Sequence, residues 1–226
     1  MQKTIYPIAY IENDFKEKFG VPRQSGRATS IISKISLVNE YKNVDAFRGI
    51  EGFSHLWLIF DFSLVKQDKF TPLIRPPRLG GNHKVGVFAS RSPFRPNGLG
   101  LSLVKIEQVV LVGEDAPYLL VSGADLVDKT PIFDIKPYLP KTESIPDALG
   151  GFADQVYQHK LIVKFLNDLD KILPQDKLCG IIECLSDDPR PAYQNDNRTY
   201  GMTFGDYNIK FHVDGQILFV ENVELN

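Results

Sequence analysis

The first 140 residues form a series of short apolar runs separated by Gly, Pro, Asn and Asp, and this punctuation restricts the fold more than any other feature. Residues 29–38 alternate between apolar and polar side chains, which is the period of a β-strand. The run 55–62 is almost entirely apolar, as expected for a strand buried on both faces. Further strands are expected at 84–89, 99–112 and 118–126. Many short strands with almost no helix predict an antiparallel barrel or sandwich.

The pattern changes after residue 140. Residues 141–151 are polar and contain Gly and Pro, as in a linker. Apolar residues then recur at helical spacing over 162–173 until Pro174, and a second helix is expected from Asp176. Residues 199–223 show the pattern of a β meander with a turn at Asp214-Gly215. This segment therefore predicts a small α+β unit.

We thus expect a mainly β protein with two domains, an N-terminal antiparallel β unit of residues 1–140 and an α+β unit of residues 141–226. No apolar stretch is long enough for a membrane span, and the N-terminus lacks the apolar segment of a secretion signal. Cys179 and Cys184 lie five residues apart on an expected helix and point to different faces, which disfavours a disulfide or a zinc site. These features favour a cytoplasmic protein.

Basic residues are concentrated in one part of the chain. Residues 20–100 contain 12 Lys and Arg against 5 Asp and Glu, whereas residues 101–226 contain 11 against 20, although the net charge is only −2. Several of these arginines stand beside Pro or Gly, which indicates loops that converge on a site. A basic surface on an acidic protein predicts a polyanionic partner.

Four loops at the ends of expected strands carry the candidate functional side chains: 21–27, 74–82, 91–97 and 125–131. The first three are rich in Arg, which suits bidentate recognition of carboxylate or phosphate, and their prolines restrict the backbone. The fourth is acidic. Together they predict a basic multi-loop pocket for an anionic or nucleic-acid ligand.

Composition and spacing alone do not name a reaction. There is no glycine-rich dinucleotide motif and no phosphate-binding P-loop, and the four histidines lack metal-ligand spacing, so no metal is expected. Asp125, Asp128 and Asp134 leave open a metal-dependent hydrolase. Phe88, Phe94 and Tyr138 would instead suit a non-catalytic RNA-binding β-barrel that stacks bases on aromatic rings.

Residues 86–97, Gly-Val-Phe-Ala-Ser-Arg-Ser-Pro-Phe-Arg-Pro-Asn, resemble the signature of the TrmO family, also known as TsaA-like proteins. Six further blocks extend the resemblance over most of the chain: 21–24, 53–57, 75–81, 125–131, 134–140 and 188–193. The resemblance implies a β-barrel methyltransferase that uses S-adenosylmethionine. Its substrate would be the exocyclic nitrogen of threonylcarbamoyl-adenosine beside the anticodon of threonine tRNA.

The resemblance also implies a homodimer with the cofactor near the subunit interface. For the C-terminal unit we expect a role in packing on the barrel and extending the tRNA surface. By matching position, it implies these cofactor contacts: Pro22, Arg23, Gln24, Phe62, Ser63, Leu64, Arg91, Leu101, Asp125, Leu126, Val127 and Asp128. Ser63 departs from the histidine that many members have there.

We assign tRNA binding to Arg75, Arg78, Arg95 and Asn97. The ureido N–H that accepts the methyl group is a poor nucleophile until its proton is lost or shared. We therefore expect Asp128 or Asp134 to act as a base, or Tyr138 as a hydrogen-bond donor to the adjacent carbonyl.

Overall fold

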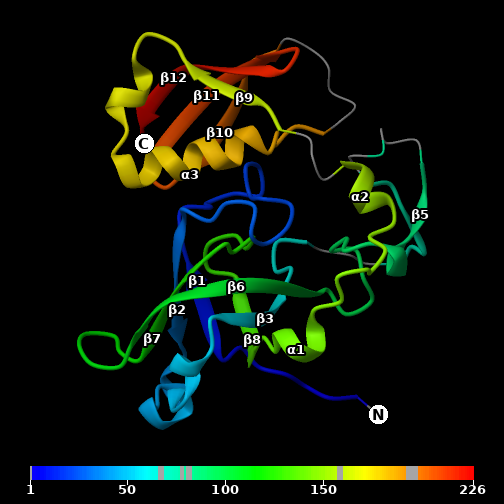
Figure 1. Ribbon diagram of the computed structural model, residues 1–226, viewed down its shortest axis with the longest axis vertical. Coiled ribbons are helices and arrows are strands. Elements are labelled where there is room, and N and C mark those ends of the chain that lie inside the picture. The colour runs from blue at the N-terminus through cyan, green and yellow to red at the C-terminus, as the bar shows by residue number, and fades with distance from the viewer. Residues whose placement is uncertain (1, 66–68, 77–78, 80–82, 157–159, 192–197) are drawn as a thin grey trace.

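The computed structural model describes residues 2–65, 69–76, 79, 83–156, 160–191 and 198–226 (Figure 1). A six-stranded barrel forms one end of the molecule, and a four-stranded sheet with one helix forms the other. Over these described ranges, no helix is long and apolar enough to cross a membrane.

The barrel closes in the order β1-β2-β7-β6-β3-β8, and every neighbouring pair is antiparallel. Its strands are β1 (Ala9–Glu12), β2 (Ile32–Leu37), β3 (His55–Asp61), β6 (Leu99–Val110), β7 (Tyr118–Ser122) and β8 (Pro131–Pro137). The predicted mainly β fold is confirmed, and closure decides for a barrel over a sandwich. Closure also removes the sheet edges that could otherwise pair with other chains.

The prediction that the run 55–62 is buried on both faces is wrong. In β3, Leu56, Leu58 and Phe60 point into the barrel core and are buried, while the alternate side chains are half-exposed on its outer surface. A barrel wall has only one inner face, so the strand is buried on one side despite its apolar sequence.

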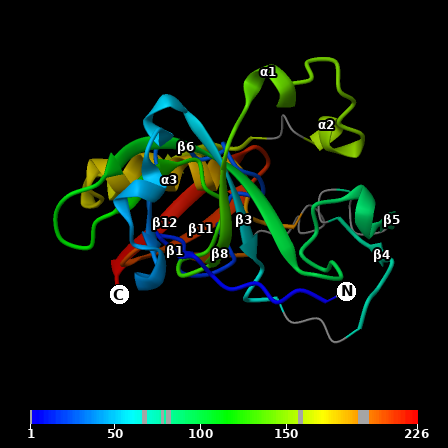
Figure 2. The same ribbon diagram turned by 90° about the horizontal axis from the view of Figure 1, so that it is seen from below.

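An arm extends from the barrel between β3 and β6 (Figure 2). It contains the hairpin of β4 (Leu73–Ile74) and β5 (Val85–Gly86), followed by the short 3₁₀ helix η5 (Val87–Ala89). The strand expected at 84–89 is therefore only two residues long. The Val87 carbonyl accepts from Ser90 Oγ at 2.9 Å and from Arg95 Nη1 at 3.3 Å, which turns the chain back and ends the strand.

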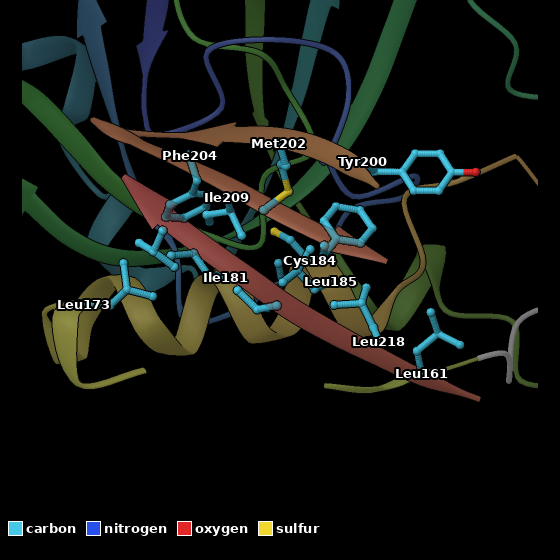
Figure 3. Packing of buried hydrophobic residues seen from close by; sticks show 14 of the residues in the cluster. Leu161, Leu173, Ile181, Cys184, Leu185, Tyr200, Met202, Phe204, Ile209 and Leu218 are labelled. Carbon is cyan, nitrogen blue, oxygen red and sulfur yellow. The ribbon is translucent and has the colours of Figure 1, made fainter. Parts of the chain in front are cut away.

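The C-terminal unit is a sheet in the order β10-β11-β12-β9, with helix α3 (Gln175–Ser186) against one face (Figure 3). Its strands are β9 (Ile162–Phe165), β10 (Tyr200–Phe204), β11 (Tyr207–Asp214) and β12 (Ile217–Leu225). The predicted second helix and the meander are present. The turn between β11 and β12 lies at Gly215-Gln216, one residue later than expected.

The predicted helix over 162–173 is wrong. Residues 162–165 form β9, which pairs in parallel with β12, and Val163 and Phe165 pack against the core. Asn167 and Asp168 adopt positive φ values of 52° and 57°, which no helix continues through. Of the apolar residues at helical spacing, Phe165, Leu169 and Leu173 pack in the C-terminal core, whereas Ile162, Leu166 and Ile172 are exposed.

The remaining helices are short. They are η1 (Asn39–Tyr41), η2 (Val44–Phe47), η3 (Ile50–Gly52), α1 (Pro140–Glu143), α2 (Phe152–Val156) and η6 (Leu169–Ile172). The segment expected as a linker, 141–151, includes most of α1 and leads to α2. The exact domain boundary at residue 140 stays a prediction.

Two hydrophobic cores organise these elements. One fills the barrel, and the other lies between α3 and the C-terminal sheet. The second core also buries Phe15, Ala28 and Ile31, which precede the barrel strand β2 in sequence. The segment between β1 and β2 is thus shared between the two parts of the molecule.

Candidate functional site

A cavity of about 550 Å³ lies at one end of the barrel, beside the end of β3. Its volume falls within the range of small-molecule sites. Three of the four loops singled out from the sequence contribute to it, together with the turn after β3 and the start of β6. All proposed cofactor residues except Asp128 line the cavity: Pro22, Arg23, Gln24, Phe62, Ser63, Leu64, Arg91, Leu101, Asp125, Leu126 and Val127.

The first loop, residues 21–27, is tied to the barrel by three hydrogen bonds. Arg91 Nη1 donates to Gln24 Oε1 at 3.0 Å, which joins two of the predicted loops directly. Gly26 N donates to Gly123 O at 2.8 Å, and Leu103 N donates to Ser25 Oγ at 3.2 Å. These bonds hold the loop across the cavity mouth.

Arg95 has a structural part in its own loop. Its Nη1 donates to Ser90 O at 2.7 Å and to Val87 O at 3.3 Å, so the guanidinium crosses the loop and fixes its shape. Arg95 also lines the cavity, where it is half-buried, whereas Arg91 is exposed. The loop therefore presents one guanidinium held by backbone carbonyls and one that reaches Gln24.

Asp125 is the acidic group of the cavity with a clearly altered acidity. Burial raises the pKa of its carboxyl to about 6, while Ser102, its own backbone N–H and the Arg91 guanidinium oppose this only in part. Asp125 Oδ1 is inaccessible to solvent and has no hydrogen-bond partner among the described residues. A carboxyl with a pKa near neutrality can exchange a proton at physiological pH.

The rest of the wall is largely apolar. Phe60 and Phe62 meet edge to face with ring centroids 5.0 Å apart. Gly100 lies beneath the Phe60 ring, where an added Cβ would be 2.2 Å from Phe60 Cζ, so glycine allows the ring to cover the strand. Such a surface suits a flat ring and a methyl-bearing group.

The three residues expected to act in catalysis do not line this cavity. Asp128 accepts from Lys16 Nζ at 2.8 Å and from Asn13 N at 2.9 Å. Asp134 pairs with Lys136 Nζ at 2.8 Å on the exposed barrel wall. Tyr138 packs against His55 and Trp57, at the opposite end of β3 from the cavity. Their catalytic roles stay predictions.

The geometry disfavours the metal-dependent hydrolase. Asp125, Asp128 and Asp134 have separate environments and do not converge, as the contacts above describe. Over the described residues, no group of three or more His, Cys, Asp and Glu side chains is placed to hold a metal ion. Cys179 and Cys184 are free, one exposed and one buried.

The proposed tRNA-binding residues have different positions. Arg75 is exposed at the end of β4 on the arm, and Asn97 is exposed in the loop before β6. Arg95 lines the cavity as described. Arg78 lies outside the described residues.

The sequence interpretation missed two charged residues of the cavity, Lys18 and Asp61. Lys18 Nζ donates to the Leu64 carbonyl and so holds the turn after β3. Asp61 ends the apolar run of β3. A charged residue at the end of such a run could have indicated from the sequence that Asp61 belongs to the site. Nothing in the sequence near Lys18 distinguishes it from other surface lysines.

The fold and the site place this chain in the class of ligand-binding β-barrel proteins. Its barrel is closed, arginines line the cavity between its loops, and its sequence contains neither a Rossmann nor a P-loop nucleotide motif. The chain matches the family described as "tRNA-methyltransferase O N-terminal domain" over residues 10–144, and the "TrmO C-terminal domain" over residues 158–226. The chain belongs to the TrmO family.

Relatives support this assignment over nearly the whole length. The chain is 43% identical over 216 residues to the tRNA (adenine(37)-N6)-methyltransferase of Escherichia coli, covering 91% of each. It is 39% identical to a putative S-adenosylmethionine-dependent methyltransferase, RcsF, of Pseudomonas aeruginosa, covering 94% of this chain and 93% of the relative. The crystal structure of TrmO from Pseudomonas aeruginosa superposes with a TM-score of 0.78 at 32% identity, covering 99% of this chain and 100% of that one.

Proposed function

We propose that this protein is a tRNA methyltransferase that transfers a methyl group from S-adenosylmethionine to the exocyclic nitrogen of threonylcarbamoyl-adenosine beside the anticodon of threonine tRNA. The observation that carries the proposal is the barrel-end cavity, because it gathers nearly all residues that family resemblance assigns to the cofactor. Identity of 43% to a named tRNA (adenine(37)-N6)-methyltransferase supports the reaction and the tRNA substrate.

The cavity residues fit the chemical groups of the cofactor. The Arg91 guanidinium is exposed at the cavity and can pair with a carboxylate, and Asp125 can accept from an ammonium or hydroxyl group. Phe60, Phe62 and Leu101 provide apolar surface for a nucleobase. When bound, S-adenosylmethionine supplies a methyl group on a positively charged sulfur. Transfer of this methyl group does not require a metal ion.

The residues of the chain have two tasks in this reaction. The loops hold the donor and acceptor in line, which supplies much of the rate because a displacement needs aligned reactants. A proton must also leave the ureido nitrogen. Asp125 lines the cavity and the three predicted catalytic residues do not, so we assign the proton acceptor to Asp125 ahead of Asp128, Asp134 and Tyr138.

The proposal includes a homodimer and a cytoplasmic location. Large apolar side chains are exposed on the arm: Phe88 at 74%, Leu64, which also lines the cavity, at 53%, and Phe94 at 45%. Exposed apolar surface commonly marks interaction sites. Sedimentation equilibrium on the purified protein tests the dimer, and a monomer at all concentrations would contradict it.

The deciding experiment is methyl transfer from labelled S-adenosylmethionine to threonine tRNA, prepared with and without its threonylcarbamoyl group. We expect label only in the carbamoylated tRNA. As a matched control, a tRNA that lacks adenosine at the position beside the anticodon should take up no label. Label in unmodified tRNA would identify a different acceptor, and no label in any tRNA, with a folded protein, would favour the non-catalytic RNA-binding barrel.

A further inference from the structure

The segment that joins β1 to β2, residues 13–31, lies between the barrel and the C-terminal unit (Figure 1). It carries Pro22, Arg23 and Gln24, which line the barrel-end cavity. Its flanks are anchored in the C-terminal core through Phe15 and Ile31, both buried. Residues 13–31, which form one wall of the cavity, are therefore supported by the C-terminal unit, although that unit begins more than a hundred residues later in the sequence.

This loop is packed only in part: Pro22 is buried and Val21 packs against the C-terminal core, but the loop also borders two cavities. A second cavity of about 390 Å³ lies behind it, between residues 18–23 and the end of α3. Val21, Pro22 and Arg23 line both cavities. Because the loop is only partly packed, its hydrogen bonds and ion pairs contribute to holding its position.

On the barrel side, the loop is held by the hydrogen bonds of Gln24, Ser25 and Gly26 described above. On the other side, the turn after α3, residues 187–190, supplies the partners. Arg23 Nη2 donates to Arg190 O at 2.7 Å, and Arg27 Nε donates to the Asp187 carboxylate. The side chains of Arg27 and Asp187 are only 11% and 8% exposed, so this ion pair is little screened by water.

The turn itself is braced by charge. Arg190 Nε donates to Asp188 Oδ1 at 3.0 Å, and both residues are buried. Asp187 N and Asp188 N donate to carbonyls of the last turn of α3. The turn whose Arg190 carbonyl accepts from Arg23 is thus bonded to the end of α3.

We propose that the turn 187–190 of the C-terminal unit is part of the cofactor site, with Arg27 and Asp187 as positioning residues that hold loop 21–27 in its binding conformation. The inference rests on the proposed function for the identity of the ligand, S-adenosylmethionine. It goes beyond the expectation that the C-terminal unit packs on the barrel and extends the tRNA surface, because it gives the unit a part in cofactor binding.

The chain offers a matched control at the other end of α3. Lys177 Nζ pairs with Asp14 Oδ2 at 2.6 Å and joins the same two parts of the molecule. Neither residue lines either cavity. The two ion pairs lie at opposite ends of a 12-residue helix, roughly 15 Å apart along its axis.

The test is the dissociation constant of S-adenosylmethionine, measured by titration calorimetry on Asp187→Asn and Lys177→Gln, with the melting temperature of each. We expect Asp187→Asn to weaken binding by at least about fivefold, the lower end of typical site-to-site coupling. Lys177→Gln should leave the dissociation constant within about twofold of the unmodified protein. A purely stabilising role would lower both melting temperatures and move neither affinity.

Asp187→Asn removes the carboxylate charge that Arg27 pairs with in a little-exposed position, and could prevent folding. The double variant Arg27→Gln/Asp187→Asn removes both charges and should show the same weakened binding. On the unmodified protein, S-adenosylmethionine should also slow hydrogen exchange of the amides of Asp187 and Asp188. Unchanged affinity in the folded variants, or unchanged exchange at these amides, overturns the inference, whereas an unmodified protein that binds no S-adenosylmethionine overturns the proposed function.

Discussion

At the scale of single residues, Asp125 has the most informative environment in the cavity. It stands at the end of the buried stretch that follows β7, where desolvation favours its neutral form. Asp125 Oδ1 is buried at the cavity wall, and no hydrogen bond to this atom compensates for the loss of solvent. Such an environment is typical of functional carboxyls.

The first prediction concerns stability. The pKa of Asp125 is about 6 in the folded protein against 3.8 as the ordinary value, so the folded state binds more protons between these values. Stability therefore falls as pH rises through this window, by up to roughly 3 kcal/mol. Asp125→Asn removes this loss, so it should be more stable than the unmodified protein at pH 8 and similar at pH 4. Urea unfolding at the two pH values measures this, and a pH-independent difference would contradict it.

The second prediction concerns the reaction. If Asp125 accepts the proton, the single-turnover rate at saturating cofactor should rise with pH with a midpoint near 6. Asp125→Asn should lower that rate by about 10²- to 10⁴-fold and remove the pH dependence. Asp128→Asn and Asp134→Asn serve as comparisons because neither lines the cavity. If Asp128→Asn or Asp134→Asn lowers the single-turnover rate while Asp125→Asn leaves it unchanged, the proton acceptor is the residue expected from the sequence and not Asp125.

At the scale of elements, α3 shows how a contact between elements can oppose a local preference. Gly180 lies in the helix interior, where alanine is ordinarily about 1 kcal/mol more favourable. An added Cβ at Gly180 would be 2.6 Å from Ile31 Cγ1 and 3.1 Å from Phe204 Cζ. Ile31 is a stiff β-branched residue buried between α3 and the rest of the core, so it has little freedom to move.

The third prediction is that Gly180→Ala destabilises the protein, by roughly 1 to 3 kcal/mol, as overpacking does. Helix propensity alone predicts the opposite sign. Gly52→Ala is the matched control, because nothing lies within 4 Å of its added Cβ. Chemical denaturation of both variants distinguishes overpacking from helix propensity as the larger effect. A stabilised Gly180→Ala variant would show that Ile31 moves aside.

At the scale of the whole molecule, the uneven charge of the chain should govern how it meets tRNA. Most of the arginines belong to residues 20–100, which include the arm and two of the cavity loops. The C-terminal half is acidic, so the basic part of the surface is expected to orient the tRNA on the protein.

The fourth prediction follows from this arrangement. tRNA affinity should fall steeply with salt, with a log–log slope of about −0.7 to −0.9 for each phosphate contacted. Arg75→Ala, on the arm, should reduce the slope by about one. Arg48→Ala should not, because Arg48 follows η2, at the end of the barrel away from the arm, and pairs with Asp45 (Figure 1). Filter binding over a range of salt concentrations measures both, and a flat salt response would exclude phosphate contacts as the main source of affinity.

Short-range patterns of residues were enough to predict several elements of the fold. Apolar runs and two-residue alternation, with turn residues between them, predicted β2, β3, β6 and β7, and helical spacing predicted α3. The barrel strand β8 was not predicted. The successful patterns are those set by neighbouring residues, namely strand pleat, helix period and turn geometry. The cofactor residues taken from the motif blocks stay a prediction, although all of them except Asp128 line one cavity.

The other features depend on contacts between segments that are distant in the sequence. It made residues 162–165 a strand, because pairing with β12 outweighed a helical spacing of apolar residues. It moved Asp128, Asp134 and Tyr138 away from the cavity, since the direction of a side chain depends on register and on partners such as Lys16. It also joined Arg23 and Arg27 to residues 187–190, contacts separated by about 160 positions that no local pattern encodes. Local propensity acts over a few residues, whereas packing and ion pairing act between segments that meet only when the chain folds.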